Sequence, residues 1–258
     1  MSSKIRNILI VVLLVVIVVV VHLMRRNATM RGLECNVTTT GATLLTSAEV
    51  DSLIHVHYPL FDQTKVKDID KDGIKSALEK NPYIDQATVE VTSGGKVLVD
   101  VIQHTPVVRM FYQGNEFYLS REGTCMPLAP QHYCNIMVGN SDFKEAPVKK
   151  LSSLQLTDTS NHQRPQGLQK IWTLSSFLFD NPKYGDVFDQ VYLDEKGDLY
   201  LVPKVSSLYI QVGDTTHLQT KFENLWAFFD QGINQVGWDA YSAISLKYKG
   251  QVVCTWAE

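Results

Sequence analysis

The longest apolar stretch of the chain lies near its N-terminal end. Fourteen consecutive Ile, Leu and Val residues run from Ile8 to Val21, and Leu23 and Met24 follow after His22. At about 1.5 Å of rise per residue, a helix over residues 8–24 is roughly 25 Å long, near the lower limit for crossing a hydrocarbon core. Because no polar face interrupts the run, we expect a transmembrane helix over residues 8–24.

The flanks of this run bear on its processing and orientation. A cleavable signal peptide is the alternative, but it would lead into a small-residue cleavage site, whereas this run leads into Arg25 and Arg26. We therefore expect an uncleaved anchor. Basic residues on both sides leave the positive-inside rule close to a tie. The short tail, residues 1–7, and the long region after the run favour a cytoplasmic N-terminus.

The next part of the chain predicts the order β-α-α-β-β. The segment Thr46 to Glu49 reads as a capping box that opens a helix with one apolar stripe. A second helix is expected over Asp72 to Lys80, before an Asn-Pro pair. Apolar and polar residues then alternate over residues 87–91 and 97–101 around a Gly-Gly turn, which predicts a hairpin. Cys35 to Val37 can supply an earlier edge strand.

Beyond Pro106, short apolar segments recur between turn signals and predict a second, mostly antiparallel β domain over residues 106–258. Two helices are expected within it, Leu168 to Phe179 and His217 to Asp230, and a loop is expected over Leu151 to Gly167. The fold class is therefore α+β. The expected strands are Val107–Tyr112, Phe117–Ser120, Cys134–Val138, Val187–Leu193, Leu199–Val202 and Ser207–Val212, followed by a hairpin of Ser242–Tyr248 and Gln251–Trp256.

Charge and cysteine spacing argue against several kinds of ligand and site. Without the four basic residues nearest the anchor, 20 Lys and Arg face 27 Asp and Glu. A chain this acidic, with no basic block, is not expected to bind nucleic acid. No C-x-x-C pair occurs, so zinc and thioredoxin-type sites are not predicted. Cys125 and Cys134 could close a disulfide loop in an oxidising compartment, or they could be buried free thiols; the sequence leaves both open.

One motif matches a calcium loop in form. Asp68-x-Asp70-x-Asp72-Gly73, followed by Glu79, fits the pattern of an EF-hand. An EF-hand needs a helix on each side of the loop, and here an Asn-Pro pair would end the exit helix almost at once. We therefore interpret these carboxylates as caps of a helix N-terminus.

Other catalytic and metal-binding patterns are weak. Ser141-x-x-Lys144 resembles a penicillin-binding nucleophile motif, but S-D-N and K-T-G are missing from the sequence. His55 and His57 are two residues apart on a predicted helix, so their side chains face different ways. The sequence predicts no catalytic, cofactor or metal site, and no enzyme.

The last predicted hairpin is rich in aromatic residues. Tyr241, Tyr248 and Trp256 lie within it. Terminal strands often lie at a sheet edge, where unpaired backbone groups can accept a strand from another chain. The aromatic residues could equally cover the inner face of the sheet. From the pattern alone, both interpretations stay open.

Four stretches of the chain match, in order, segments of a known protein family: Asn81–Val89 after the second helix, His104–Arg109 between the domains, Phe117–Gly123 with its turn, and the final hairpin from Leu246 to Trp256. Together with the order of the predicted elements, they resemble the bacterial FtsQ/DivIB cell-division family, most closely Bacteroidetes-type FtsQ. Tyr83 stands where the family usually has Trp, Gln103-His104 where it has an acidic residue, and Ser245 where it has Asp.

The resemblance implies a POTRA domain over residues 31–105 and a non-catalytic scaffold of the divisome. Such a scaffold links early and late division proteins and regulates septal peptidoglycan synthesis by binding FtsB- and FtsL-like partners and possibly other divisome membrane proteins. It implies a single-pass inner-membrane protein at the septum, with a periplasmic bulk. In the family the last hairpin receives FtsB by strand addition. The corresponding residues here are Lys247, Tyr248, Lys249, Gly250, Val252, Val253 and Trp256.

Two other functions are compatible with the same predicted domains. A POTRA-like module could belong to another envelope assembly, such as a secretion system. A tethered periplasmic hydrolase is the other alternative, although the sequence offers no catalytic constellation for it.

Overall fold

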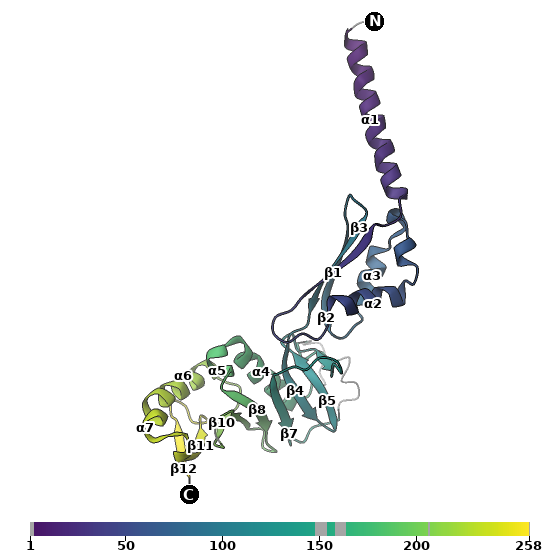
Figure 1. The fold of residues 1–258 in the computed structure, drawn as a ribbon. Coiled ribbons are helices and arrows are strands. Elements are labelled where there is room, and N and C mark those ends of the chain that lie inside the picture. Colours follow the sequence, from purple (N-terminus) through teal and green to yellow (C-terminus); the bar gives the residue numbers. More distant parts are fainter. Residues whose placement is uncertain (1–2, 148–153, 158–163, 206, 258) are drawn as a thin grey trace. The chain divides into compact units, whose positions relative to one another are not determined.

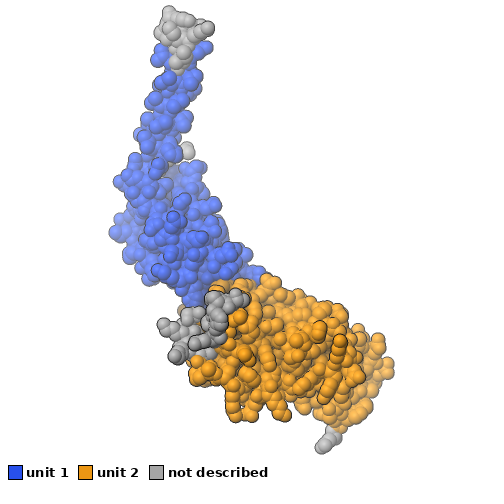
Figure 2. Space-filling view, turned by 180° about the vertical axis from the view of Figure 1, so that it is seen from behind, with its two compact units in different colours: residues 1–103 blue, residues 104–258 orange. Residues whose placement is uncertain are grey.

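The chain folds into two compact units, residues 1–103 and 104–258, each with its own hydrophobic core (Figure 2). The structure is a computed structural model, and it describes residues 3–147, 154–157, 164–205 and 207–257. Helices and strands occur in both units, so the predicted α+β class is confirmed.

The first unit begins with the helix α1, Ser3–Asn27 (Figure 1). Its large apolar side chains between Leu9 and Met24 are exposed. Among the described residues, no helix combines the length and the apolarity that a membrane crossing requires. The span expected over residues 8–24 therefore stays a prediction.

The rest of the first unit has the predicted order β-α-α-β-β. Its helices pack against a sheet in which β1 lies parallel to β3 and β2 lies antiparallel to it, in the order β1-β3-β2. Val97, Val99 and Val101 of β3 are buried and alternate with the more exposed Leu98 and Asp100, as half-buried strands do. The elements are β1 Gly32–Thr38, α2 Ser47–His57, α3 Lys71–Leu78, β2 Ile84–Val91 and β3 Lys96–Gln103, with short 3₁₀ turns at Phe61–Gln63 and Val66–Asp68.

Side-chain caps define both helix starts, as the sequence predicted. Thr46 Oγ1 accepts from the Glu49 N–H at 3.3 Å, while Glu49 Oε2 accepts from the Thr46 N–H at 2.7 Å, so the capping box is complete. At α3, Asp70 Oδ1 accepts from the Gly73 N–H at 2.9 Å. Asp70 thus acts as a helix cap, as we interpreted it.

The second unit contains, within the described residues, a nine-stranded sheet in the order β12-β11-β10-β9-β8-β7-β4-β5-β6. The strand expected from Cys134 begins only at Met137, and the short β6 was not predicted. The strands are β4 Pro106–Tyr112, β5 Asn115–Ser120, β6 Cys125–Pro127, β7 Met137–Ser141, β8 Phe188–Leu193, β9 Leu199–Pro203, β10 Tyr209–Gly213, β11 Tyr241–Ser245 and β12 Val253–Trp256.

This sheet is mixed, which refines the expected mostly antiparallel domain. In the described part of the chain, β4–β7, β7–β8 and β10–β11 are parallel and the other five pairings are antiparallel. Parallel neighbours need long crossover connections, which usually contain a helix. Accordingly, α4 Gln166–Asp180 and α5 Pro182–Gly185 lie between β7 and β8, and α6 Leu218–Phe228 and α7 Asn234–Val236 lie between β10 and β11.

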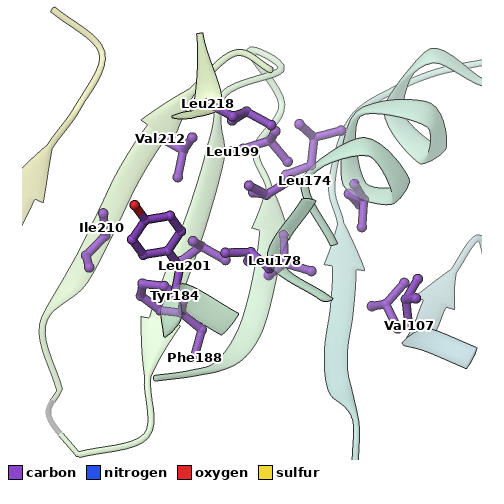
Figure 3. Packing of buried hydrophobic residues seen from close by; sticks show 14 of the residues in the cluster. Val107, Leu174, Leu178, Tyr184, Phe188, Leu199, Leu201, Ile210, Val212 and Leu218 are labelled. Atoms are coloured by element: carbon purple, nitrogen blue, oxygen red, sulfur yellow. The ribbon is translucent and has the colours of Figure 1, made fainter. Parts of the chain in front are cut away.

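The core of the second unit lies between the sheet and these helices (Figure 3). Leu174 and Leu178 of α4 and Phe222 of α6 are buried in the same cluster as the inward residues of the strands. The two predicted long helices are thus present as α4 and α6. Most of the loop expected over Leu151 to Gly167 lies outside the described residues, and its last two residues begin α4.

Candidate partner-binding edge

β12 forms one end of the nine-stranded sheet. It pairs antiparallel with β11 and, among the described residues, has no neighbour on its other side. The Ala257 N–H donates to the carbonyl of Ala240, the residue before β11, at 3.0 Å. Because backbone groups alternate in direction along a strand, Thr255 and Val253 also bond toward β11, while Cys254 and Trp256 turn their N–H groups to the open edge. The edge can therefore accept a further strand.

Side chains of the hairpin divide between two faces of the sheet. Tyr248, Val253 and Trp256 are 58%, 42% and 64% exposed. Val252 and Cys254 are only partly exposed and pack against the buried core. Side chains alternate along an extended chain, so Val253 faces away from Val252 and Cys254. Trp256 lies on the same face as Val252 and Cys254 and stays exposed there.

Trp256 does not project freely from the edge. Its ring centroid lies 4.6 Å from that of Tyr241, which in turn lies 5.8 Å from the ring of Phe228. Tyr241 itself packs against the core. An aromatic side chain held in this way presents its open face with little further loss of conformational freedom on binding. The edge therefore carries a partly preorganised aromatic contact.

The basic residues of the hairpin differ in their surroundings. Lys247 Nζ donates to Asp198 Oδ2 at 2.7 Å, and this hydrogen bond raises the pKa of Lys247. Lys249 is exposed in the turn, where Gly250 takes the left-handed φ of +71° that glycine adopts without a steric cost. Lys247 is thus already engaged with the residue that precedes β9, whereas Lys249 is exposed in the turn.

A cleft of about 190 Å³ adjoins the hairpin. One wall is the turn from Leu246 to Gln251, and the other is the start of α6 with the residues before it. Lys221 Nζ donates to Asp214 Oδ1 at 2.7 Å in that second wall. The hydrogen bond from Lys221 lowers the pKa of Asp214 to about 2, although partial burial acts in the opposite direction. This wall therefore carries an ion pair between Lys221 and Asp214 at neutral pH.

The opposite end of the sheet is less accessible. The Cys125 N–H of β6 donates to the Leu154 carbonyl at 3.2 Å, and the Leu156 N–H donates to the Gly123 carbonyl at 2.8 Å. Residues 154–156 thus run along that end and satisfy part of its backbone. An edge strand covered in this way has fewer free backbone groups to pair with another chain. Of the two ends of this sheet, β12 is the open one.

The weaker motifs do not assemble into catalytic or metal sites. Ser141 Oγ accepts from the Phe143 N–H at 3.2 Å, whereas Lys144 Nζ pairs with Glu195 at 3.2 Å. The two residues of that motif are therefore engaged separately. Around His55, the ring contacts the Asp51 carbonyl and the Asp62 carboxylate, while His57 is exposed. No group of three His, Cys, Asp or Glu residues within the described ranges is placed to hold a metal ion.

All four cysteines are free thiols in the structure. Burial raises the pKa of Cys125 to about 12, and burial followed by the charge of Asp51 raises that of Cys35 to about 11. Since the thiolate is the reactive form, neither is suited to act as a nucleophile. The sequence left open whether Cys125 and Cys134 form a disulfide or are buried free thiols. In the structure they are buried free thiols.

Sequence reasoning located the hairpin but missed its surroundings. The contact between Lys247 and Asp198 joins residues 49 positions apart, and no local pattern signals it. The α6 wall of the cleft was likewise missed. The opposite directions of Val252 and Val253 follow from strand alternation and could have been found.

The second unit is similar to a known protein family. A family described as "FtsQ/DivIB, C-terminal related" matches residues 105–255. This range corresponds closely to the second compact unit, residues 104–258, and includes the whole of β11 and all but the last residue of β12. A search of curated proteins found no match.

Proposed function

The chain belongs to the FtsQ/DivIB C-terminal-related family, and on this basis we propose that it is a non-catalytic, membrane-attached scaffold of the bacterial divisome. Membership of this family indicates a role in cell division at the septum, together with other division proteins. The proposal adds an anchor, a docking edge and a partner. The anchor and the edge rest on the exposure and pairing of described residues, and the partner rests on the resemblance to the family.

The proposed anchor is α1. Its Ile, Leu and Val side chains from Leu9 to Val21 are exposed to solvent, and a lipid environment would remove that area from water. We assign residues 1–7 to the cytoplasm and the region after residue 24 to the periplasm. The β-α-α-β-β module over residues 31–105 is then a POTRA domain next to the membrane.

The proposed docking site is the open edge of β12, and this edge carries the argument for partner binding. It combines outward N–H groups at Cys254 and Trp256 with exposed side chains at Tyr248, Val253 and Trp256. Strand addition gives affinity through main-chain hydrogen bonds and specificity through alternate side chains. Lys249 and Gly250 shape the adjoining turn. We propose that an FtsB-like strand pairs here, in a complex that includes an FtsL-like protein and regulates septal peptidoglycan synthesis.

The docking assignment can be tested by co-purification of an FtsB-like partner with the full-length chain. Tyr248→Glu and Trp256→Ala should each reduce capture, because they remove exposed contacts at the edge; loss of a central Trp contact typically costs about 2 kcal/mol or more, or roughly 30-fold in affinity. Tyr133→Ala is the matched control, since Tyr133 is also an exposed aromatic of the second unit, at 84% exposure, and lies outside the hairpin.

Unchanged capture by both hairpin variants, with the far-UV circular dichroism of each intact, would refute the docking assignment. The role itself is tested by depletion in the native cell. Filamentous cells with blocked septa are expected, whereas normal septation with an export defect would favour the secretion alternative.

A further inference from the structure

A second pocket lies in the first unit, where α1 meets the module that follows it. It has a volume of about 490 Å³. Its ionisable side chains are His22, Arg26 and Arg31, and no acidic residue lines it. The rest of the lining is mixed, with the β2–β3 turn from Thr92 to Gly95 beside the apolar residues Val66 and Val91. The pocket is therefore positively charged, with both polar and apolar walls.

Backbone hydrogen bonds hold this pocket in place. The Val66 N–H donates to the Ala28 carbonyl at 3.0 Å, and the Arg31 N–H donates to the Gly95 carbonyl at 2.8 Å. Gly95 has a φ of +82°, and a Cβ there would lie 3.3 Å from Val66 Cγ2. The short connection after α1 is thus fastened on both sides, which fixes Arg31 against the turn.

Within the described part of the chain, no carboxylate neutralises the two arginines of the pocket. Neither Arg26 nor Arg31 forms an ion pair with a carboxylate among the described residues, and both side chains are exposed. Guanidinium groups match phosphate oxygens by paired, charge-assisted hydrogen bonds. The pocket therefore suits a phosphate-bearing ligand that is small enough for its volume.

The neighbourhood of the pocket indicates where that phosphate comes from. Leu23 and Met24, on the last turns of α1 before Arg26, are 52% and 70% exposed. A lipid would place its acyl chains against such residues and its headgroup one turn further along the helix. With α1 in the bilayer as proposed, Arg26 and Arg31 lie just beyond its apolar run, near the level of the lipid headgroups.

We propose that this pocket binds the phosphate headgroup of an anionic phospholipid in the membrane leaflet next to the first module. The inference rests on the proposed membrane attachment of α1. Arg26 and Arg31 would hold the phosphate, and the β2–β3 turn would close the site on the side of the module. Such binding fixes the orientation of the module at the bilayer surface.

The test uses the full-length chain in a non-ionic detergent with equimolar phosphatidylglycerol and phosphatidylcholine, and native mass spectrometry measures which lipid stays bound. The wild type should prefer phosphatidylglycerol. Each arginine replaced by glutamine should lower the preference about fivefold, as expected for one cation near an anionic lipid surface. Arg26→Gln with Arg31→Gln should therefore nearly abolish the preference, and the double lysine variant at these positions should keep part of it.

Lys71→Gln with Lys80→Gln is the matched control. It removes two charges from exposed positions of the same unit that do not line the pocket, and it should leave the lipid preference unchanged. Equal retention of both lipids by the wild type, or an unchanged preference in the double arginine variant, would overturn the proposal.

Two further measurements separate the remaining outcomes. Inorganic phosphate that binds in an arginine-dependent way, without any lipid preference, would identify a site for free phosphate and overturn the lipid assignment. Flotation with pure phosphatidylcholine vesicles tests attachment alone. If the chain floats but shows no preference for anionic lipid, only this inference fails; if it does not float, the proposed anchor fails.

Discussion

Phe222 offers the sharpest test of the packing that supports the docking edge. It lies on α6 and is 0% exposed. Its ring centroid lies 5.3 Å from that of Phe177, 5.5 Å from that of Tyr184 and 6.0 Å from that of Phe188. Phe222→Ala removes the ring shared by these three contacts. A buried Phe→Ala change costs about 3–5 kcal/mol, and we expect the upper half of that range because the site joins a helix to a strand.

The tryptophans provide an assay that reports on the second unit alone. All four Trp residues lie within residues 104–258, at Trp172, Trp226, Trp238 and Trp256. Urea unfolding of the full-length chain, followed by Trp fluorescence, therefore leaves the first unit silent. With a denaturant slope of about 2 kcal/mol per molar urea, a loss of about 4 kcal/mol moves the midpoint down by roughly 2 M.

Two variants calibrate this prediction. Phe222→Leu keeps most of the apolar volume and should cost clearly less than Phe222→Ala, because volume-conserving exchanges are better tolerated. Tyr133→Ala, at an exposed position, should change stability by no more than about 0.5 kcal/mol. A loss below about 1.5 kcal/mol for Phe222→Ala would refute the described packing of α6.

Three other predictions address charge, thiols and close packing. Because the hydrogen bond from Lys221 lowers the pKa of Asp214 to about 2, below the unfolded value of about 3.9, the ion pair stabilises the fold above pH 4 and loses that contribution as the pH falls toward 2. Urea titrations should show Asp214→Asn costing at most about 1 kcal/mol at pH 7, since Asp214 is largely exposed, and less at pH 2; an equal cost at both pH values would contradict this. Burial raises the pKa of Cys125 to about 12, so iodoacetamide at pH 8 should label it, by peptide mapping, only as the chain unfolds, and rapid labelling of the native protein would show an open site. Gly139→Ala places a Cβ 3.1 Å from Val108 Cγ2 and against the Met110 sulfur, so urea unfolding should show a loss of about 1–3 kcal/mol, and an unchanged midpoint would mean that β7 and β4 lie further apart.

The parts of the fold that were predictable depend on local signals. The capping box at Thr46, the Asp70 cap and the alternation along Val97 to Val101 each involve residues a few positions apart. Such patterns specify their own element almost without reference to the rest of the chain. The two long helices of the second unit were found in the same way, from their apolar periodicity.

The parts that could not be predicted depend on pairings between distant segments. The parallel pairs β4–β7 and β10–β11 are each separated by a long stretch of chain. The apolar pattern of a strand does not indicate which distant strand it pairs with. β6 has three residues, too few for any periodicity. At the candidate site the hairpin itself was predicted, but its position at the open end of the sheet came from the resemblance and from the structure.

The fastened connection after α1 also has a mechanical consequence. Only the four residues from Ala28 to Arg31 separate α1 from β1, and fully extended they would span at most about 14 Å. With α1 in the bilayer, as proposed, the first module has almost no slack and cannot swing away from the lipid surface as a domain on a flexible tether would. A rotation or tilt of α1, for example when a neighbouring membrane helix binds it, would then turn the module with it. The anchor would thus transmit torque as well as hold position.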